Sequence, residues 1–360
     1  MKAAVLREVG QAMAIEDVTI SKPKAREVLL RTAAVGVCHS DLHFIDGLFK
    51  YPLPTVPGHE AAGIVEAVGS EVRSVKPGDH VITCLSAFCG HCAHCVTGHL
   101  SLCTGAETRR GDGEEARIAS RQAPMMQFLN LSAFAEQMLI HENACVAIRE
   151  DMPLDRAALI GCAVMTGVGA VIHTASVRPG ETVAVIGCGG VGLSAINGAA
   201  MAGAGRIIAV DRIAGKLDLA RRFGATDVVD AGAVDAVAAV RDLTKGGVDH
   251  AFEAIGLKAT AEQAFRMICR GGTATIIGMI PRGTMLEVDG FEFLSEKRLQ
   301  GSLMGSNRFP VDMPRLVEAY LRGHLKLDEL IAQRLPLDRI NDAVAELRLG
   351  NLARSVIVMA

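Results

Sequence analysis

Tryptophan is absent from this 360-residue chain, and the aromatic residues together make up only 4% of it. So few aromatic rings argue against a surface on which nucleic-acid bases stack. Neither sign of charge dominates, because the formal net charge is −3 and the sequence has no long basic run. We therefore expect no nucleic-acid partner.

Long uninterrupted apolar segments are missing as well. The N-terminal stretch MKAAVLREVGQAMAIED carries a charge every few residues, unlike a signal peptide. The richest apolar run, GCGGVGLSAINGAAMAGAG, is dominated by glycine and alanine and fits a turn and a helix better than a membrane span. These features predict a soluble, cytoplasmic protein without a membrane partner.

The chain does contain ample material for packed cores, because 50% of its residues are hydrophobic. Its length predicts two domains. Before about residue 150, short β-branched runs alternate with Gly, Pro and Asp, which predicts an irregular β-rich domain with a surface loop at 104–127. From about residue 154, short apolar strands alternate with amphipathic helices, the pattern of a doubly wound parallel sheet.

A glycine-rich turn lies near the start of this second half. In TVAVIGCGGVGLSA, a buried strand leads through Gly187, Gly189 and Gly192 into a helix. Such glycines permit a tight turn, a close approach of backbone to a pyrophosphate, and close packing of helix on strand. The next strand, RIIAV, ends at Asp211, whose carboxylate can bind a ribose 2′-hydroxyl and repels a 2′-phosphate. The sequence therefore predicts NAD rather than NADP, although the adjacent Arg212 weakens that preference.

Four of the ten cysteines are clustered in CGHCAHCVTGHLSLC. Their spacing, C-x2-C-x2-C-x7-C, suits zinc, because CxxC turns present two thiolates to one ion. Four protein ligands leave no open coordination position, so this zinc would be structural, and the histidines among the cysteines would face solvent. The predicted ligands are Cys89, Cys92, Cys95 and Cys103.

A catalytic zinc, by contrast, needs three protein ligands and an open position. The candidates are Cys38 in AVGVCHSDLH, His59 beside Glu60 in PGHEAAG, and Cys162 in GCAVMTGVGAV. They lie far apart in the sequence, and their spacing alone does not assemble them. An isolated Cys or His is more often a core residue than a ligand.

Taken together, these motifs resemble a known family. GVCHSDLH, PGHEAAGIVEAVG, VKPGDHVI, the cysteine cluster, GCAVMTGVGAV, VIGCGGVG and ARSVIV are similar, in order and spacing, to the zinc-containing alcohol dehydrogenases of the medium-chain dehydrogenase/reductase superfamily. The resemblance runs essentially from end to end. It implies an α/β fold with a GroES-like irregular β-barrel catalytic domain (1–163 and 305–360) and a doubly wound Rossmann domain that binds NAD (164–304).

The resemblance also implies roles around the catalytic metal. Asp41 would hydrogen-bond the ligand His59 and fix its tautomer, and Glu60 would lie behind the metal. Ser40 would touch the substrate oxygen and begin a proton relay through the nicotinamide ribose to His43. The implied ligands of this second zinc, whose fourth position holds water or substrate, are Cys38, His59 and Cys162.

Contacts to cofactor and substrate follow from the same resemblance. His39 and Arg354 would contact the pyrophosphate of NAD. The full set of residues implied to contact NAD is His39, Thr166, Gly187, Gly189, Gly190, Val191, Gly192, Asp211, Arg212, Lys216, Met279 and Arg354. The residues implied to line the substrate pocket are Ser40, Phe49, Leu85, Phe128, Leu129 and Met279. This mostly apolar lining favours apolar primary, aryl or secondary alcohols over polyols.

The implied activity is hydride transfer between an alcohol and NAD, or from NADH to an aldehyde or ketone, with zinc stabilising the alkoxide. Within EC 1.1.1.-, EC 1.1.1.1 is favoured. Two alternatives stay open: a nicotinoprotein that keeps its NAD bound, and a thiol-adduct formaldehyde dehydrogenase in which Arg109 and Arg110 could contact an anionic substrate. The resemblance also implies a dimer in which the last strands of the nucleotide-binding sheet pair, and KRLQGSLMG at 297–305 would supply that edge. A homodimer is favoured over a tetramer, because the loop after Cys103 is nearly as long as in the dimeric branch of the family.

Overall fold

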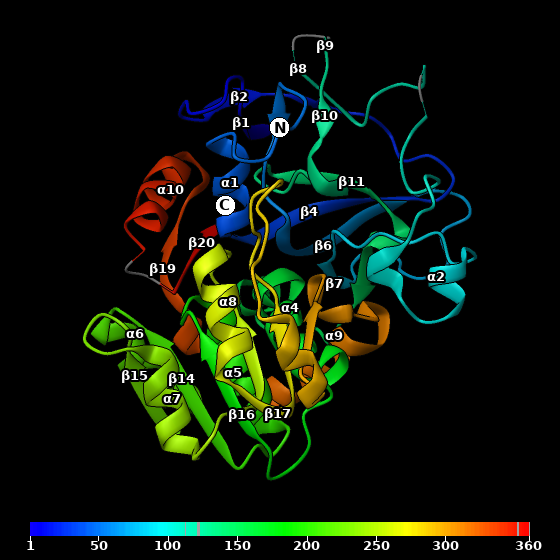
Figure 1. Cartoon of the computed structure of the whole chain (residues 1–360). Helices are drawn as coiled ribbons and strands as arrows, with labels where there is room; N and C mark the ends of the chain where they lie inside the picture. Colours follow the sequence, from blue (N-terminus) through cyan, green and yellow to red (C-terminus); the bar gives the residue numbers. More distant parts are fainter. Residues whose placement is uncertain (112, 121–122, 351–352, 360) are drawn as a thin grey trace. The chain divides into compact units, whose positions relative to one another are not determined.

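The protein is represented by a computed structural model in which residues 1–111, 113–120, 123–350 and 353–359 are described (Figure 1). The chain divides into two compact units. The first unit comprises Met1–Cys162, Arg308–Gly323 and Leu327–Ala360, and the second comprises Ala163–Asn307 and His324–Lys326. The sequence-based boundaries of the functional domains stay a prediction.

The first unit is built on a seven-stranded, largely antiparallel sheet. Apolar residues at alternate positions of its strands pack into one core, as in β4, where Val28 and Leu30 are fully buried. The strand β11 (Gln137–His141) pairs with β4, beside the main path. The order along that path is β12 (Cys145–Ala147), β7 (His80–Thr83), β6 (Glu60–Val68), β4 (Glu27–Gly36), β20 (Arg354–Val358) and β19 (Ile331–Leu335).

Smaller sheets and helices complete this unit. The small sheets are β1 (Lys2–Val5) with β2 (Ala14–Asp17), β5 (Thr55–Val56) with β10 (Met126–Gln127), and β3 (Thr19–Ile20) with β8 (Ile118–Ser120) and β9 (Ala123–Pro124). The helices are α1 (His39–Ile45), α2 (Ala93–Val96), α3 (Leu154–Leu159), α9 (Phe309–Leu321) and α10 (Ile340–Leu349). Strands β8, β9 and β10 lie inside 104–127, so the prediction of a simple surface loop there is wrong.

The second unit contains a six-stranded parallel sheet. Its order is β15 (Asp227–Asp230), β14 (Arg206–Asp211), β13 (Thr182–Ile186), β16 (Val248–Glu253), β17 (Ile268–Ile276) and β18 (Arg298–Gly301). Numbered along the chain, this order is 3-2-1-4-5-6, which defines a doubly wound nucleotide-binding sheet with its ligand crevice where the order reverses. The helices are α4 (Met165–Gly169), α5 (Gly190–Met201), α6 (Ala214–Phe223), α7 (Ala236–Thr244) and α8 (Lys258–Met267).

Short 3-10 turns connect many of these elements. They lie at Leu100–Leu102, Phe128–Asn130, Glu142–Ala144, Gly290–Ser295, Met304–Ser306, Asp328–Leu330 and Leu337–Arg339.

One continuous helix of the described residues, Leu154–Thr174, is long and apolar enough to cross a membrane. Its most apolar window is 78% buried within the protein, which is the environment of a core helix. Two π-helical turns, Ile160–Val164 and Ala170–Thr174, interrupt it. Such turns are rare and often occur at functional sites.

Candidate active site and zinc sites

Sheet register brings two of the separated zinc candidates together. Strands β4 and β6 are antiparallel, and Gly36 at the end of β4 pairs with Glu60 at the start of β6. Cys38 therefore follows one strand at the same end of the sheet where His59 precedes the other. On the other side of β4, Gly36 pairs with Val356, which brings Arg354 to the same end.

The third candidate, Cys162, arrives on the π-helical turn Ile160–Val164. Gly161 lets this turn approach the sheet closely, because a β-carbon there would lie 2.8 Å from the carbonyl oxygen of Thr83. Cys162 Sγ lies 3.3 Å from His59 Nε2. The ligand atoms of Cys38, His59 and Cys162 all lie within 4.8 Å of one another, and the three side chains are buried.

Asp41 fixes the orientation of His59. Asp41 Oδ1 lies 2.8 Å from His59 Nδ1, so the other ring nitrogen, Nε2, is the one presented to Cys162. The backbone amides of Gly58 and Cys38 donate to Oδ1 and Oδ2 of this fully buried carboxylate at 3.2 and 3.1 Å. A carboxylate behind a histidine ring is the usual arrangement that sets the tautomer of a metal ligand.

A buried arginine and a buried glutamate, Arg354 and Glu60, lie beside the same three residues. Arg354 Nε is 3.5 Å from Glu60 Oε1, and Arg354 Nη2 is 3.7 Å from Cys38 Sγ. Burial raises the pKa of Glu60 to about 8, although the charge of Arg354 lowers it. Neither carboxylate oxygen of Glu60 makes a hydrogen bond to any described residue. A β-carbon at Gly36 would overlap the Glu60 carboxylate, so any other residue there would force that carboxylate to move.

This donor set fits a zinc ion with an open coordination position. The pKa of Cys38 lies well below its ordinary value. The largest cause is a hydrogen bond from Cys162, and the positive charges of Arg354 and His59 lower the pKa further, whereas burial raises it. The thiolate is the form of cysteine that binds metals. Zinc bonds of about 2.3 Å to sulfur and about 2.0 Å to nitrogen separate the two ligand atoms by about 3.5 Å at tetrahedral angles, close to the 3.3 Å between Cys162 Sγ and His59 Nε2.

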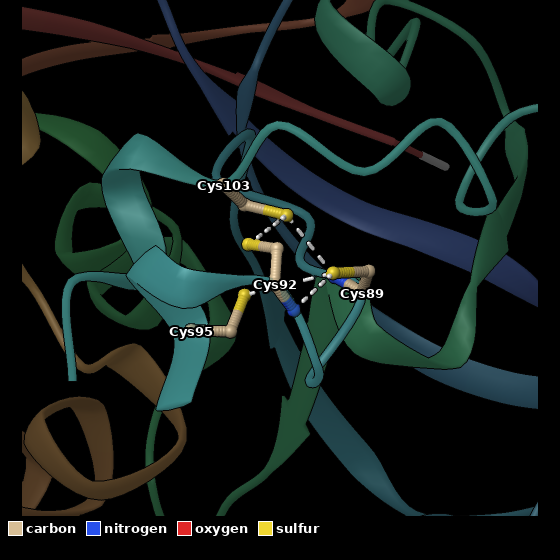
Figure 2. Close-up of side chains that lie close together, drawn as sticks. All are labelled: Cys89, Cys92, Cys95 and Cys103. Carbon is tan, nitrogen blue, oxygen red and sulfur yellow. Dashed lines mark hydrogen bonds between the residues drawn. The ribbon is translucent and has the colours of Figure 1, made fainter. Parts of the chain in front are cut away.

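The cysteine cluster forms a second, four-ligand site. Figure 2 shows the sulfur atoms of all four cysteines turned toward a common centre. Cys89 Sγ lies 3.9 Å from Cys95 Sγ, and Cys92 Sγ lies 4.0 Å from Cys103 Sγ. A tetrahedral zinc with bonds of about 2.3 Å requires sulfur atoms about 3.8 Å apart, whereas a disulfide requires about 2.05 Å. Backbone amides of Cys92 and Gly105 donate to the sulfurs of Cys89 and Cys103. The cluster therefore fits structural zinc.

The predicted proton-relay residues share one short helix. Ser40 and His43 lie three positions apart on α1, and residues at that spacing share a helix face. Ser40 Oγ lies 3.7 Å from Cys38 Sγ. The His43 ring meets the Phe49 ring edge-on at 5.9 Å. Burial lowers the pKa of His43 below 6.5, so the ring is neutral and able to accept a proton at neutral pH.

Aromatic residues are gathered next to this site. The buried Phe128 ring lies 6.3 Å from the His59 ring, 5.1 Å from Phe44 and 5.0 Å from Tyr51, measured between centroids. The sequence predicted Phe49 and Phe128 as pocket residues but missed Phe44 and Tyr51. A signal was available, because three of the few aromatic residues fall within 44–51.

A strained turn holds two other predicted pocket residues in place. Leu129 has φ of 45° and Asn130 has φ of 66°, values that L-residues adopt at some energetic cost. The Leu129 amide donates to the Tyr51 hydroxyl at 3.2 Å, and that hydroxyl donates to the Gln127 carbonyl at 2.7 Å. Asn130 Nδ2 donates to the carbonyl of Leu85 at 3.0 Å. Sequence analysis missed Tyr51 and Asn130, because their role depends on this local backbone geometry.

The glycine-rich turn in the second unit has the geometry that its spacing predicts. Gly187 has φ of +95°, in the region that favours glycine. A β-carbon on Gly189 would meet nothing within 4 Å, so space is open above the N-terminus of α5. A β-carbon on Gly192 would overlap the carbonyl oxygen of Gly187. Asp211 accepts the Cys188 amide on Oδ2 and the Arg212 amide on Oδ1, both at 2.8 Å, which ties the ends of β13 and β14 together.

The remaining predicted residues are divided between the two units. His39 and Arg354 belong to the first unit, where His39 is exposed and Arg354 is 2% exposed. In the second unit, the buried Thr166 donates to Met304 Sδ at 3.5 Å. The roles of His39, Arg354 and Thr166 toward NAD stay predictions. The same holds for three partly exposed residues of the second unit, Val191, Lys216 and Met279.

Fold and sites together define a dehydrogenase with a nucleotide-binding unit and a zinc-binding β unit. The sequence matches the family models of the alcohol dehydrogenase GroES-like domain over residues 24–150 and of the zinc-binding dehydrogenase over residues 190–319. The chain belongs to the zinc-containing alcohol dehydrogenases of the medium-chain dehydrogenase/reductase superfamily. This confirms the predicted family, fold class and zinc-dependent dehydrogenase chemistry.

Relatives of this chain are similar over almost its whole length. A probable S-(hydroxymethyl)glutathione dehydrogenase 1 of Schizosaccharomyces pombe is 38% identical and covers 99% of this chain and 97% of its own. Alcohol dehydrogenase 1 of Trifolium repens is 34% identical with the same coverage. The crystal structure of benzyl alcohol dehydrogenase from Acinetobacter calcoaceticus superposes with a TM-score of 0.94 at 33% identity, covering 100% of this chain and 99% of that one.

Proposed function

We propose that the protein interconverts apolar alcohols, aryl primary alcohols above all, and their aldehydes with NAD as hydride acceptor. The observation that carries this proposal is the aromatic cluster around Phe128, whose ring lies against the ligand residue His59. Flat aryl groups pack well against such rings. Similarity to a benzyl alcohol dehydrogenase supports the same substrate class. EC 1.1.1.1, or a neighbouring aryl-alcohol number within EC 1.1.1.-, would describe this reaction.

In the proposed reaction, some residues of the chain bind the metal and others transfer the proton. Zinc held by Cys38, His59 and Cys162 would supply Lewis acidity that lowers the pKa of an alcohol hydroxyl, and NAD would accept the hydride. Asp41 keeps His59 in the tautomer that presents Nε2. Ser40 takes the hydroxyl proton and His43, neutral at pH 7, receives it for delivery to solvent. A H43Q variant should therefore oxidise alcohols more slowly at pH 7, which steady-state rates would test.

NAD is the proposed cofactor, rather than NADP. The Asp211 carboxylate at the end of β14 accepts three backbone amides, from Cys188 on Oδ2 and from Arg212 and Ile213 on Oδ1, and Oδ2 keeps a lone pair for a ribose hydroxyl. A 2′-phosphate would meet this negative charge. Gly189, with open space at its β-carbon position, is the proposed point of closest approach to the pyrophosphate.

S-(hydroxymethyl)glutathione oxidation is the second candidate, supported by the similarity to the Schizosaccharomyces pombe protein. The loop arginines weigh against it. Arg110 donates to Glu27, to Ser21 and to the carbonyl oxygens of Lys22 and Glu115, so its guanidinium is engaged within the protein. Arg109 is exposed and donates through Nε to Asn130.

The nicotinoprotein alternative has its own test. If the protein were a nicotinoprotein, NAD would stay bound to it during gel filtration.

A homodimer in the cytoplasm is the proposed physiological form. Among the described residues β18 pairs with β17 alone, and the adjacent 280–303 segment exposes several large apolar side chains. Such an edge and patch are typical of a surface that pairs with a second copy. None of the ten cysteines, all of which lie in the described part of the chain, forms a disulfide, which suits a reducing compartment. Sedimentation of the purified protein would test the dimer. The exposed apolar residues are Met285, Phe291, Phe293, Leu294 and Leu303.

The activity is tested with a panel of alcohols and aldehydes followed by NADH absorbance. The panel contains benzyl alcohol, ethanol, a polyol, and formaldehyde with and without glutathione, each with NAD and with NADP. The proposal predicts the highest kcat/KM for benzyl alcohol with NAD. Preference for formaldehyde only in the presence of glutathione would instead establish the second candidate. NADH formation from none of them would reject both.

A further inference from the structure

An exposed histidine and glutamate lie against the four-cysteine zinc site. His91 is in the chain between Cys89 and Cys92, and Glu107 follows Cys103. His91 Nε2 lies 3.0 Å from Glu107 Oε1, with side chains 69% and 54% exposed. The ligand atoms of Cys89, His91 and Glu107 all lie within 4.8 Å of one another. Cys89 therefore belongs to two overlapping sets of ligands, one of four sulfurs and one of mixed atoms.

The backbone is shaped to let the carboxylate come this close. A β-carbon at Gly105 would lie 2.5 Å from Cys89 Cβ and 2.8 Å from Cys89 Sγ, and it would also collide with Glu107 Oε2. Only glycine at this position lets the Glu107 carboxylate and the Cys89 side chain pack on the same peptide. A thiolate and a carboxylate so close to each other repel unless a cation lies between them.

We propose that Cys89, His91 and Glu107 form a transfer site through which zinc enters and leaves the four-cysteine cluster. The proposal rests on the assignment of that cluster as a structural zinc site. Sulfur, imidazole nitrogen and carboxylate oxygen are all zinc ligands. A zinc ion leaving the cluster exchanges three sulfurs for one nitrogen and one oxygen while it stays bound to Cys89. It then has three protein ligands and an open side facing solvent, where a chelator or a donor molecule can bind it.

The other histidines of the cluster provide an internal comparison. His94 and His99 are also exposed and lie in the same segment, yet neither belongs to a group of potential metal ligands among the described residues. Histidine next to the cluster is therefore not sufficient. His91 differs by having both Cys89 and Glu107 within reach.

The test is the rate of zinc transfer from the full-length protein to an excess of a chromophoric zinc chelator. The release phase that persists in Cys38→Ala belongs to the cysteine cluster. H91A and E107Q are compared with H94A as a matched control, and zinc content before release is measured by mass spectrometry. We expect H91A and E107Q each to slow this phase about tenfold, the scale on which neighbouring groups affect metal sites, and H94A to leave it unchanged. The double variant should be no slower than the slower single variant.

Three results would overturn the proposal, and they are distinguishable. An unchanged rate in H91A and E107Q, with normal zinc content, would show that the pair takes no part in transfer. A faster rate would show that the pair shields Cys89 instead. Absence of zinc from the cluster in the unmodified protein would remove the premise, and it would be visible in the zinc content before any chelator is added.

Discussion

At the scale of single residues, two glycines of the same turn carry opposite constraints. A β-carbon at Gly192 would overlap the Gly187 carbonyl, whereas one at Gly189 would meet no protein atom within 4 Å. We predict that G192A lowers the free energy of unfolding by about 2 kcal/mol, the scale of a steric overlap in a packed region, and abolishes NADH binding. G189A should keep the stability within about 0.5 kcal/mol but weaken NADH binding about tenfold.

Chemical denaturation and NADH fluorescence titration measure the two effects separately. If G189A bound NADH as tightly as the unmodified protein, the pyrophosphate would not approach this glycine, and the proposed cofactor position would be wrong. Equal destabilisation by both substitutions would contradict the role of Gly192 in packing α5 on β13.

Residue types alone indicated some of these functions and concealed others. The spacing of Gly187, Gly189 and Gly192 was sufficient because one tight turn fixes their geometry. His91 and Glu107 could not be paired from the sequence, because their contact depends on the fold of the cysteine segment. Phe44 and Tyr51 were missed for a similar reason, since Phe44 on α1, Tyr51 and Phe128 come from separate segments whose packing no local pattern specifies.

At the scale of elements, the segment 104–127 has a polar composition but contains buried charged side chains. Its charges suggested a surface loop, yet Arg117 is 6% exposed and bonds to the buried Glu27 of β4. Arg110 forms a two-point ion pair with the same carboxylate. Buried charges are tolerated when they are paired and hydrogen-bonded, so a polar sequence can form an interior contact. The network attaches the segment that carries β8 to the main sheet.

The Glu27 network gives a prediction with a defined pH window. Burial would raise the pKa of Glu27, but hydrogen bonds from Arg110, Lys24 and Arg117 hold it at about 2, below the ordinary 4.5. A lowered folded-state pKa contributes stability above pH of about 4.5 that is lost as pH falls toward 2. E27Q should lower the free energy of unfolding by about 3 kcal/mol at pH 7, because it leaves two buried arginines without a countercharge.

Urea denaturation from pH 7 to pH 3 would measure this effect. The difference between E27Q and the unmodified protein should shrink as pH falls below 4.5. Asp17→Asn is the matched control, because the Lys2–Asp17 pair is exposed and solvent screening leaves it little effect on stability. A difference that stays constant across this range would show that the charge of Glu27 is not what stabilises the fold.

At the scale of the whole molecule, the two units differ in how far the sequence alone determines them. Alternating strands and helices predict the parallel sheet of the second unit, because each strand pairs according to simple crossover rules. The first unit depends on the register of Gly36 with Glu60 and with Val356, pairings between distant segments. No local pattern specifies such a register. The grouping of Cys38, His59 and Cys162 was therefore predicted from the resemblance to the family, and not from their spacing in the sequence.

The central claim is that one chain holds two zinc ions with separate tasks, and zinc content measured alongside NADH formation tests it most directly. The account predicts two zinc ions per chain and alcohol-dependent NADH formation. Cys38→Ala should keep one zinc ion and its folded state, since the four-cysteine site is intact, and lose activity by several orders of magnitude. A Cys38→Ala protein that keeps full activity with one zinc ion per chain would contradict the assignment of the catalytic site.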